Sequence, residues 1–381
     1  MKQLTRRTFI QSGFLGVGST HFASLLEANS NENIKTSFSA SSKNLVLHQT
    51  DLFHPHGDPD DHFDLATLFA LVLQKTIDLR GIVLDFPPGH RKGDPDVLAI
   101  AQLNRLCGTF VPSAVGVSAS MKTRTDSLSE LSNSETTAVR LITQTLEEAK
   151  TPIRISCVGS ATDIAVAALR NPDLFAKKCS GIYLDAGAAF DNPDHSEMLE
   201  FNVKLNPKAY AAMFDLPCPL FWFPCWNRVE IRESEEWGTF YWLEHRDSLK
   251  GISIGLSGFF EYMFSQTADP QWLKSILREP NQDVWELILQ GKRGMWSTAS
   301  LLYLADLTVT KGGDIVPVSE INPKDELYRM EFIDVECCDN GRTNWKISET
   351  PTNRQIFHLL DPKVYPDAMT KAIHSLFMTF V

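Results

Sequence analysis

The sequence predicts an α/β protein with an open, mostly parallel sheet flanked by helices. Short apolar runs, typical of buried parallel strands, alternate with segments whose apolar residues recur at helical spacing. This alternation runs from residue 45 to about residue 223. The composition, 43% hydrophobic and 22% charged residues, is sufficient for a large core. These observations exclude a disordered or fibrous chain.

The first elements establish the strand and helix order. Leu45 to Leu47 predict a strand, and an acidic segment follows it directly. Asp58-Pro59-Asp60-Asp61 then predicts a helix start, with proline at the first helical position and acids in the first turn. Further strands are predicted at 79–84, 153–158, 181–184 and 220–223, and further helices at 97–106, 136–149, 162–169 and 208–214. Strands that alternate with helices indicate a parallel sheet.

The later part of the chain has a different pattern. Residues 230–300 are expected to form a helical, aromatic-rich cap over the strand ends, where open α/β sheets bind ligands. Polar and apolar residues alternate on both sides of Asn340-Gly341, which predicts a C-terminal β-hairpin within residues 330–347. A final helix is predicted over 367–380. The abundant tryptophans are expected mainly in the core, although they leave a homo-oligomer interface possible.

The N-terminus resembles an export signal. Arg6-Arg7 precedes a short, weakly apolar run, a pattern typical of twin-arginine signals. We therefore expect a signal peptide at 1–28, a linker at 29–43 and one domain at 44–381, in a periplasmic or secreted protein. The run is too short to span a bilayer, so no stable membrane anchor is expected.

Charge and cysteine content restrict the partners. The net charge of −11, without a cluster of Lys and Arg, argues against a nucleic-acid partner. The seven cysteines lack metal-finger spacing, and we interpret them as small buried residues without a disulfide framework.

The segment from Asp51 to Asp64 is the most unusual in the chain, with five carboxylates and three imidazoles in fourteen positions. On a helix, Asp64 shares a face with Asp60 and Asp61, and the three repel one another unless a cation neutralises them. Carboxylates favour Ca²⁺ or Mg²⁺, whereas the histidines keep Zn²⁺, Mn²⁺ or Fe²⁺ open. The alternative, that the acids only complement the helix dipole, is less favoured because Asp51 follows a strand.

These residues resemble the nucleoside hydrolase superfamily, in which a strand is followed by D-x-x-x-D-D at a helix start. Thr50-Asp51 resembles the start of that motif and Asp60-Asp61 its acidic pair, after a longer loop. Asp64 is an alternative to Asp60-Asp61 for the acidic pair of the motif, because its distance along the sequence from Gly81-Ile82 on the next strand fits the family better. In the family these carboxylates bind Ca²⁺ and activate a water against the ribosyl carbon.

Later motifs match in the same order. Residues 157–165 resemble G-x-L-T-N-I-A, which implies that the carbonyl of Val158 binds the metal, and residues 183–188 resemble M-G-G-A. Glu200-Phe201-Asn202, with 206–209, resembles E-F-N-x-x-x-D-P-E-A, whose Glu and Asn bind ribose hydroxyls. Asn192 and Asp194 are candidates to join them. The resemblance covers roughly residues 44 to 310.

The resemblance implies a Ca²⁺-dependent hydrolase of N-glycosidic bonds in ribosyl compounds. Its implied metal ligands are Asp51, Asp61, Asp64 and the Val158 carbonyl, and its implied catalytic base is Asp60 or Asp61.

One family motif is missing. A late helix begins with H-D in the family, supplying a base-contacting His and another Asp ligand, but the corresponding segment begins Met295-Trp296-Ser297. Trp296 is a candidate to stack on the substrate. His54, His56 or His62 could instead complete a different coordination sphere. Three alternatives therefore stay open: a hydrolase of another sugar-like glycoside, a metal-dependent sugar-binding protein without turnover, and an unrelated histidine-carboxylate metallohydrolase.

Overall fold

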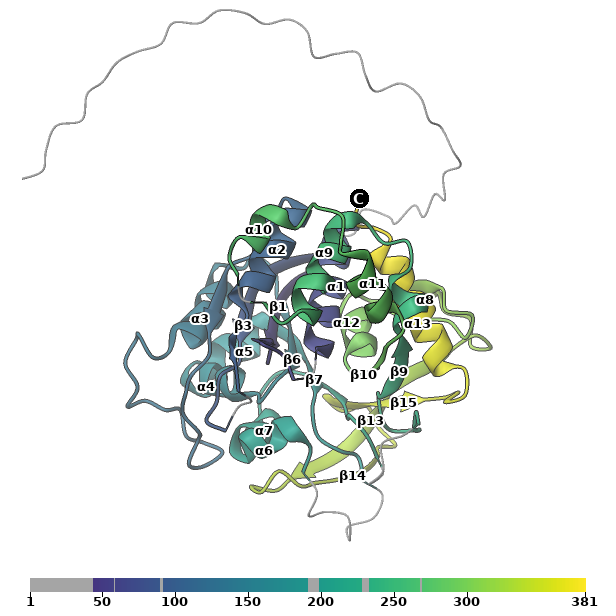
Figure 1. Ribbon diagram of the computed structural model, residues 1–381. Coiled ribbons are helices and arrows are strands. Elements are labelled where there is room, and N and C mark those ends of the chain that lie inside the picture. The colour runs from purple at the N-terminus through teal and green to yellow at the C-terminus, as the bar shows by residue number, and fades with distance from the viewer. Residues whose placement is uncertain (1–43, 58, 90–91, 191–198, 228–232, 268) are drawn as a thin grey trace, which may run out of the picture. The chain divides into compact units, whose positions relative to one another are not determined.

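The structure is a computed structural model that describes residues 44–57, 59–89, 92–190, 199–227, 233–267 and 269–381. The predicted signal peptide and linker lie outside these residues and stay predictions. A nine-stranded sheet forms the centre (Figure 1). Its strands, in spatial order, are β14 (Thr343–Ile347), β13 (Tyr328–Cys337), β15 (Arg354–Leu359), β8 (Leu220–Phe223), β7 (Cys179–Asp185), β6 (Ile153–Val158), β1 (Asn44–Thr50), β3 (Ile77–Leu84) and β5 (Ser113–Val115).

The sheet is mostly parallel, as predicted. Every pairing from β15 to β5 is parallel, and only the β13–β15 and β13–β14 pairings are antiparallel. Buried side chains alternate between its two faces, so that Val46 and Leu47 of β1 belong to different core clusters. This two-sided burial explains why the strands read as continuous apolar runs.

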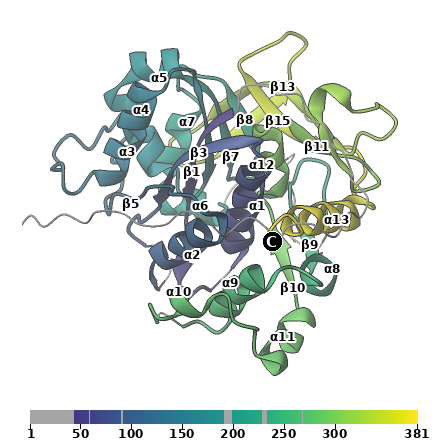
Figure 2. The same cartoon turned by 90° about the horizontal axis from the view of Figure 1, so that it is seen from above.

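Helices cover both faces of the sheet (Figure 2). One face packs against α1 (Asp60–Leu73), α2 (Val97–Cys107), α9 (Ile254–Phe264), α12 (Thr298–Leu304) and α13 (Tyr365–Phe377). The other face packs against α3 (Thr137–Glu148), α4 (Thr162–Arg170), α5 (Pro172–Lys178) and α7 (Pro207–Met213). The predicted fold class is therefore confirmed.

The expected helical cap is only partly helical. It contains α8 (His245–Leu249), α9, α10 (Trp272–Ser275) and α11 (Gln282–Leu289), but an antiparallel pair, β9 (Tyr241–Glu244) with β10 (Lys292–Met295), also belongs to it. The remaining elements are β2 (Phe53–His54), β4 (Asp94–Pro95), β11 (Leu307–Val309), β12 (Ile315–Pro317), η2 (Val318–Glu320) and α6 (Phe201–Leu205). The β9–β10 pair positions Trp296, which follows β10 directly.

The C-terminal part contains the predicted hairpin, with Gly341 at a φ of 84° in its turn. Strand β15 then returns to the parallel part of the sheet, which the sequence did not predict. All seven cysteines lie among the described residues as free thiols. Among the described residues, every helix is too short or too polar to cross a bilayer.

Candidate functional site

The carboxyl ends of three neighbouring strands form the candidate site. Asp51 follows β1, Val158 ends β6 and Asp185 ends β7, and these strands are adjacent in the sheet. Parallel strands bring such positions to one edge. The three residues line one cavity of about 210 Å³, whose other lining residues are Asp60, Asp61, Glu200, Phe201, Asn202, Trp226, Trp296 and Ser297. We call this the acidic cavity.

Helix α1 adds two acids to the acidic cavity from its first turn. It begins at Asp60, one residue later than predicted, with Pro59 in the N-cap position. Negative side chains suit this end of a helix, because the dipole is positive there. Asp61 accepts a hydrogen bond from the hydroxyl of Thr50 at the end of β1. Asp60 is half-exposed, whereas Asp61 is buried.

Asp64 lies one helical turn further on and is not among the residues that line the acidic cavity. Its side chain is buried, and neither carboxylate oxygen has a hydrogen-bond partner among the described residues. Burial and the neighbouring Asp61 raise the pKa of Asp64 well above its ordinary value. Of the two possible registers of the acidic pair, the structure thus brings Asp60 and Asp61 to the cavity, with Asp64 behind them.

Asp185 is a site residue that the sequence reasoning missed. It is 2% exposed, and the Ser300 hydroxyl donates to its Oδ2. Its Oδ1 has no hydrogen-bond partner in the described part of the chain. Burial, and secondarily Asp64, raises the pKa of Asp185 well above its ordinary value. Asp185 directly follows the strand predicted at 181–184, and this position could have indicated a site residue. The resemblance of residues 183–188 to M-G-G-A assigns its side chain no role.

Glu200 and Asn202 lie at the acidic cavity, and both have structural contacts as well. The Glu200 carboxylate caps α6, accepting from the backbone N–H groups of Asn202 at 2.8 Å and Val203 at 3.2 Å, and it also accepts from Gly187 at 3.2 Å. Nδ2 of Asn202 donates to the carbonyl of Val158 at 3.2 Å, whereas its Oδ1 has no partner among described residues. The other two substrate-binding candidates, Asn192 and Asp194, lie outside the described residues.

Trp296 joins the acidic cavity to a second cavity of about 560 Å³, because it lines both. Phe240 and Trp242 contribute further rings, and the Phe240 ring lies 5.3 Å from that of Trp296. Nζ of Lys292 lies 4.7 Å from the Trp242 ring centroid. Nε1 of Trp296 has no hydrogen-bond partner in the described structure. This aromatic cavity can hold a flat ring beside the acids.

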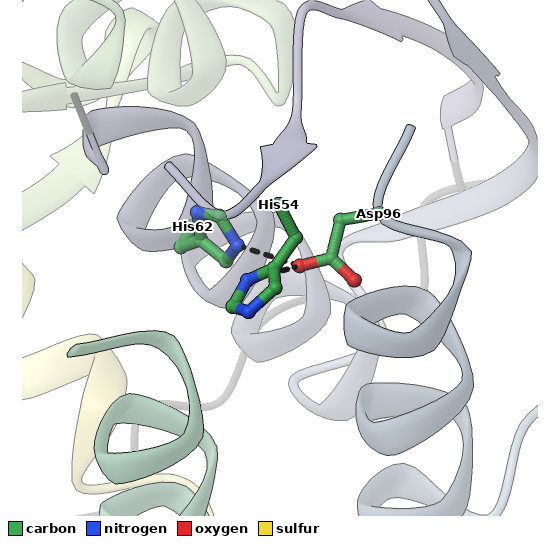
Figure 3. A group of neighbouring side chains, drawn as sticks. All are labelled: His54, His62 and Asp96. Atoms are coloured by element: carbon green, nitrogen blue, oxygen red, sulfur yellow. Dashed lines mark hydrogen bonds and ion pairs between the residues drawn. The ribbon is translucent and has the colours of Figure 1, made fainter. Parts of the chain in front are cut away.

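The histidines of the acidic segment do not line the acidic cavity. His54 and His62 instead face Asp96, the N-cap residue of α2 (Figure 3). Burial lowers the pKa of His62, with Asp96 opposing this shift. Burial acts to raise the pKa of Asp96, but the two imidazoles that face it, with Nε2 of His62 at 3.0 Å and Nδ1 of His54 at 3.5 Å, outweigh burial and keep that pKa below its ordinary value. The histidines therefore form a separate cluster.

The acidic cavity suits a divalent cation. Its potential ligands are carboxylates and the Val158 carbonyl, the hard oxygen donors that Ca²⁺ and Mg²⁺ prefer. The buried, unpartnered Oδ1 of Asp185 is also the kind of atom that a cation would satisfy.

The comparison with known families gives the class of this protein, a glycosyl hydrolase. Residues 56–290 match the family model described as inosine-uridine preferring nucleoside hydrolase, more than half of the chain, and the chain therefore belongs to this family. Members of this family bind a divalent cation. No curated protein is significantly similar in sequence.

Two solved structures show how distant the relatives are. The purine-preferring ribonucleoside hydrolase from Gardnerella vaginalis has a TM-score of 0.50 and 13% identity, over 88% of this chain and 99% of that one. The inosine-uridine preferring nucleoside hydrolase from Bacillus anthracis has a TM-score of 0.46 and 13% identity, over 87% of this chain and 99% of that one. The Gardnerella comparison supports the fold.

Proposed function

We propose that this protein hydrolyses the N-glycosidic bond of a ribonucleoside or a related ribosyl compound, with Ca²⁺ as its cofactor. The observation that carries the proposal is the common cavity of Asp51, Asp60 and Asp61 with Glu200 and Asn202. Departure of the base leaves an oxocarbenium-like ribosyl centre with positive charge, which nearby carboxylates stabilise.

Asp51, Asp61 and the carbonyl of Val158 would hold the cation. Asp185 would add a buried carboxylate at the same cavity, which Ser297 also lines. Asp64 would contribute negative charge from behind Asp61. A bound divalent cation lowers the pKa of a nearby water.

We assign proton removal from the attacking water to Asp60. Asp61 accepts the Thr50 hydrogen bond, which orients its carboxylate as a ligand would need. Asp60 is more exposed and lies in the same helical turn, at the cavity surface. Glu200 and Asn202 would bind the ribose hydroxyls, with the amide as donor and the carboxylate as acceptor.

The aromatic cavity favours a flat leaving group. Trp296 would stack on it, and its unpartnered Nε1 offers a hydrogen bond to a ring atom or hydroxyl. This arrangement supports a nucleoside over a purely aliphatic glycoside. Another sugar-like glycoside, or sugar binding without turnover, is the alternative.

The test is reducing-sugar release by the purified protein from a panel of purine and pyrimidine nucleosides, with Ca²⁺ and with a chelator. We expect release that the chelator abolishes. Asp60→Asn should lower kcat by about 10² to 10⁴-fold, the usual contribution of a general base. Asp61→Asn should weaken Ca²⁺ binding, and exposed Asp173→Asn is the matched control. Folded protein that releases sugar from none of the nucleosides would exclude the proposal.

A further inference from the structure

A second group of metal-ligand side chains lies outside the acidic cavity. His54 belongs to β2, His62 to the first turns of α1, and Asp96 to the N-cap of α2. All three are buried, at 6%, 1% and 3% exposure. Figure 3 shows both imidazoles directed at one oxygen of Asp96.

The distances fit a small coordination sphere. Oδ2 of Asp96 lies 3.0 Å from Nε2 of His62 and 3.5 Å from Nδ1 of His54. Two ligands of a tetrahedral ion with bonds of about 2.0–2.1 Å are separated by roughly 3.4 Å. One ligand atom from each residue lies within 4.8 Å of the other two, so small ring rotations would close the set.

The carboxylate is oriented by its other oxygen. Oδ1 of Asp96 accepts from the backbone N–H of Ala99 at 2.9 Å and from the Tyr262 hydroxyl at 3.0 Å. The Tyr262 ring also stacks on His54, with centroids 4.7 Å apart and planes 17° apart. Supporting contacts of this kind fix the ligands of metal sites before the ion binds.

Hydrogen bonding within the protein leaves the imidazoles incompletely satisfied. Nε2 of His62 bonds to Asp96, but its Nδ1 and both ring nitrogens of His54 have no hydrogen-bond partner among the described residues. Unsatisfied polar atoms at this depth are costly. A cation bound by Oδ2 of Asp96 and Nε2 of His62 would also satisfy Nδ1 of His54, the nearest unpartnered nitrogen.

We infer that His54, His62 and Asp96 form a second metal site, for a transition-metal ion such as Zn²⁺, that fixes the loop between Asp51 and Asp60. Two imidazoles and one carboxylate suit such an ion better than Ca²⁺. The fourth position would take water or His56, whose ring centroid is 5.9 Å from that of His62.

The role follows from the positions of the ligands. His54 lies within the loop that separates Asp51 from Asp60, His62 lies just beyond its end, and Asp96 belongs to another segment. A metal bond between them would restrict the loop and lower its conformational entropy. The site would thus hold both ends of the acidic segment in place.

The test measures metal binding, which does not depend on turnover. The full protein, stripped by chelator and shown to be folded, would be titrated with Zn²⁺ against a chromophoric competitor, and with Co²⁺ for its visible absorption. We expect one Zn²⁺ per chain that millimolar Ca²⁺ does not displace. His54→Gln and His62→Gln should weaken it at least 100-fold, whereas His374→Gln on α13 should not.

Asp61→Asn separates this site from the acidic cavity, because it should leave Zn²⁺ stoichiometry unchanged whether or not the protein hydrolyses nucleosides. If His62→Gln fails to fold, His54→Gln decides, since His54 lies outside the large helices. Folded wild-type protein that takes up no Zn²⁺ or Co²⁺, or His54→Gln protein with wild-type affinity, would overturn the inference. His54 and His62 would then serve only to hold the Asp96 carboxylate in place.

Discussion

At the scale of single residues, we propose that Asp185 replaces a carboxylate that the family's missing H-D motif would supply. Ser297 lines the acidic cavity and lies in the segment that resembles the family's late H-D helix start. Asp185 lines the same cavity with a buried oxygen that has no partner among the described residues. A carboxylate moved from the start of α12 to the end of β7 would preserve the number of acids around a cation.

The exchange can be measured with two substitutions. We expect Asp185→Asn to weaken Ca²⁺ binding about 10 to 100-fold by calorimetry, because it removes one charged oxygen ligand. Its fold should survive, since burial already favours the neutral form of this side chain. Adding Ser297→Asp to that variant should restore part of the affinity. Wild-type affinity in Asp185→Asn would show that Asp185 is not a ligand.

At the scale of elements, strands with a local signal were predictable, either as a buried apolar run or as alternation around a turn, whereas β15 was not. Strands β6 and β8 have the predicted bounds because each is a run of buried residues ended by a turn. Strand β15 begins with two polar residues, Arg354 and Gln355. It lies between β13, with which it pairs in the antiparallel sense, and β8, with which it pairs in the parallel sense. A local pattern holds no information about these pairings.

The candidate site shows the same division. Asp51 was identifiable because it ends a strand that the sequence already defines. The capping role of Glu200 was not, because one of its three backbone donors, Gly187, comes from a different segment. Likewise, Asp96 lies 34 residues after its partner His62, so their cluster appears only in the folded chain.

Helix α6 provides the prediction at this scale. Glu200→Gln replaces one carboxylate oxygen by an NH₂ group, which cannot accept a hydrogen bond. If Oε2 is replaced, the bonds from Val203 and Gly187 are lost; if Oε1 is replaced, the bond from Asn202 is lost. We expect the free energy of unfolding to fall by about 1–3 kcal/mol, measured by denaturant titration. Exposed Glu147→Gln on α3 is the control and should change it little. An unchanged stability would mean that the cap contributes nothing.

At the scale of the whole molecule, several buried aspartates have raised pKa values, so that their ionisation is unfavourable in the folded state. Burial raises the pKa of Asp85 to about 6, and it raises the pKa values of Asp64, Asp163 and Asp185 well above their ordinary range. The folded state therefore binds these protons more tightly than the unfolded state does. The contribution of these four acids to stability is then greatest below the unfolded-state pKa of about 3.8–3.9 and is lost as pH rises through the folded-state values.

Asp85 alone would account for a loss of about 3 kcal/mol between pH 4 and pH 7, from its rise of roughly two pKa units. Burial lowers the pKa of His48 to about 3 and that of His56 to about 4, which makes stability rise over the same range. The contribution of the acids is therefore measured as the difference between wild type and an acid-to-amide variant in chelator, by denaturant titration at each pH. Ca²⁺ should offset the loss due to the acids most at the higher pH, because it stabilises the ionised carboxylates of Asp185 and Asp64. Ligand at 100 times its Kd stabilises by about 2.7 kcal/mol.

General repulsion within a chain of net charge −11 would give the same sign, so a matched pair of variants separates the two causes. Asp185→Asn and exposed Asp173→Asn remove the same charge, but only the first removes a buried acid. In chelator, we expect stability relative to wild type to improve as pH rises in Asp185→Asn, and to do so less in Asp173→Asn. We also expect a smaller gain from Ca²⁺ in Asp185→Asn alone. Equal slopes in the two variants would attribute the pH dependence to net charge and remove the acidic cavity as its source.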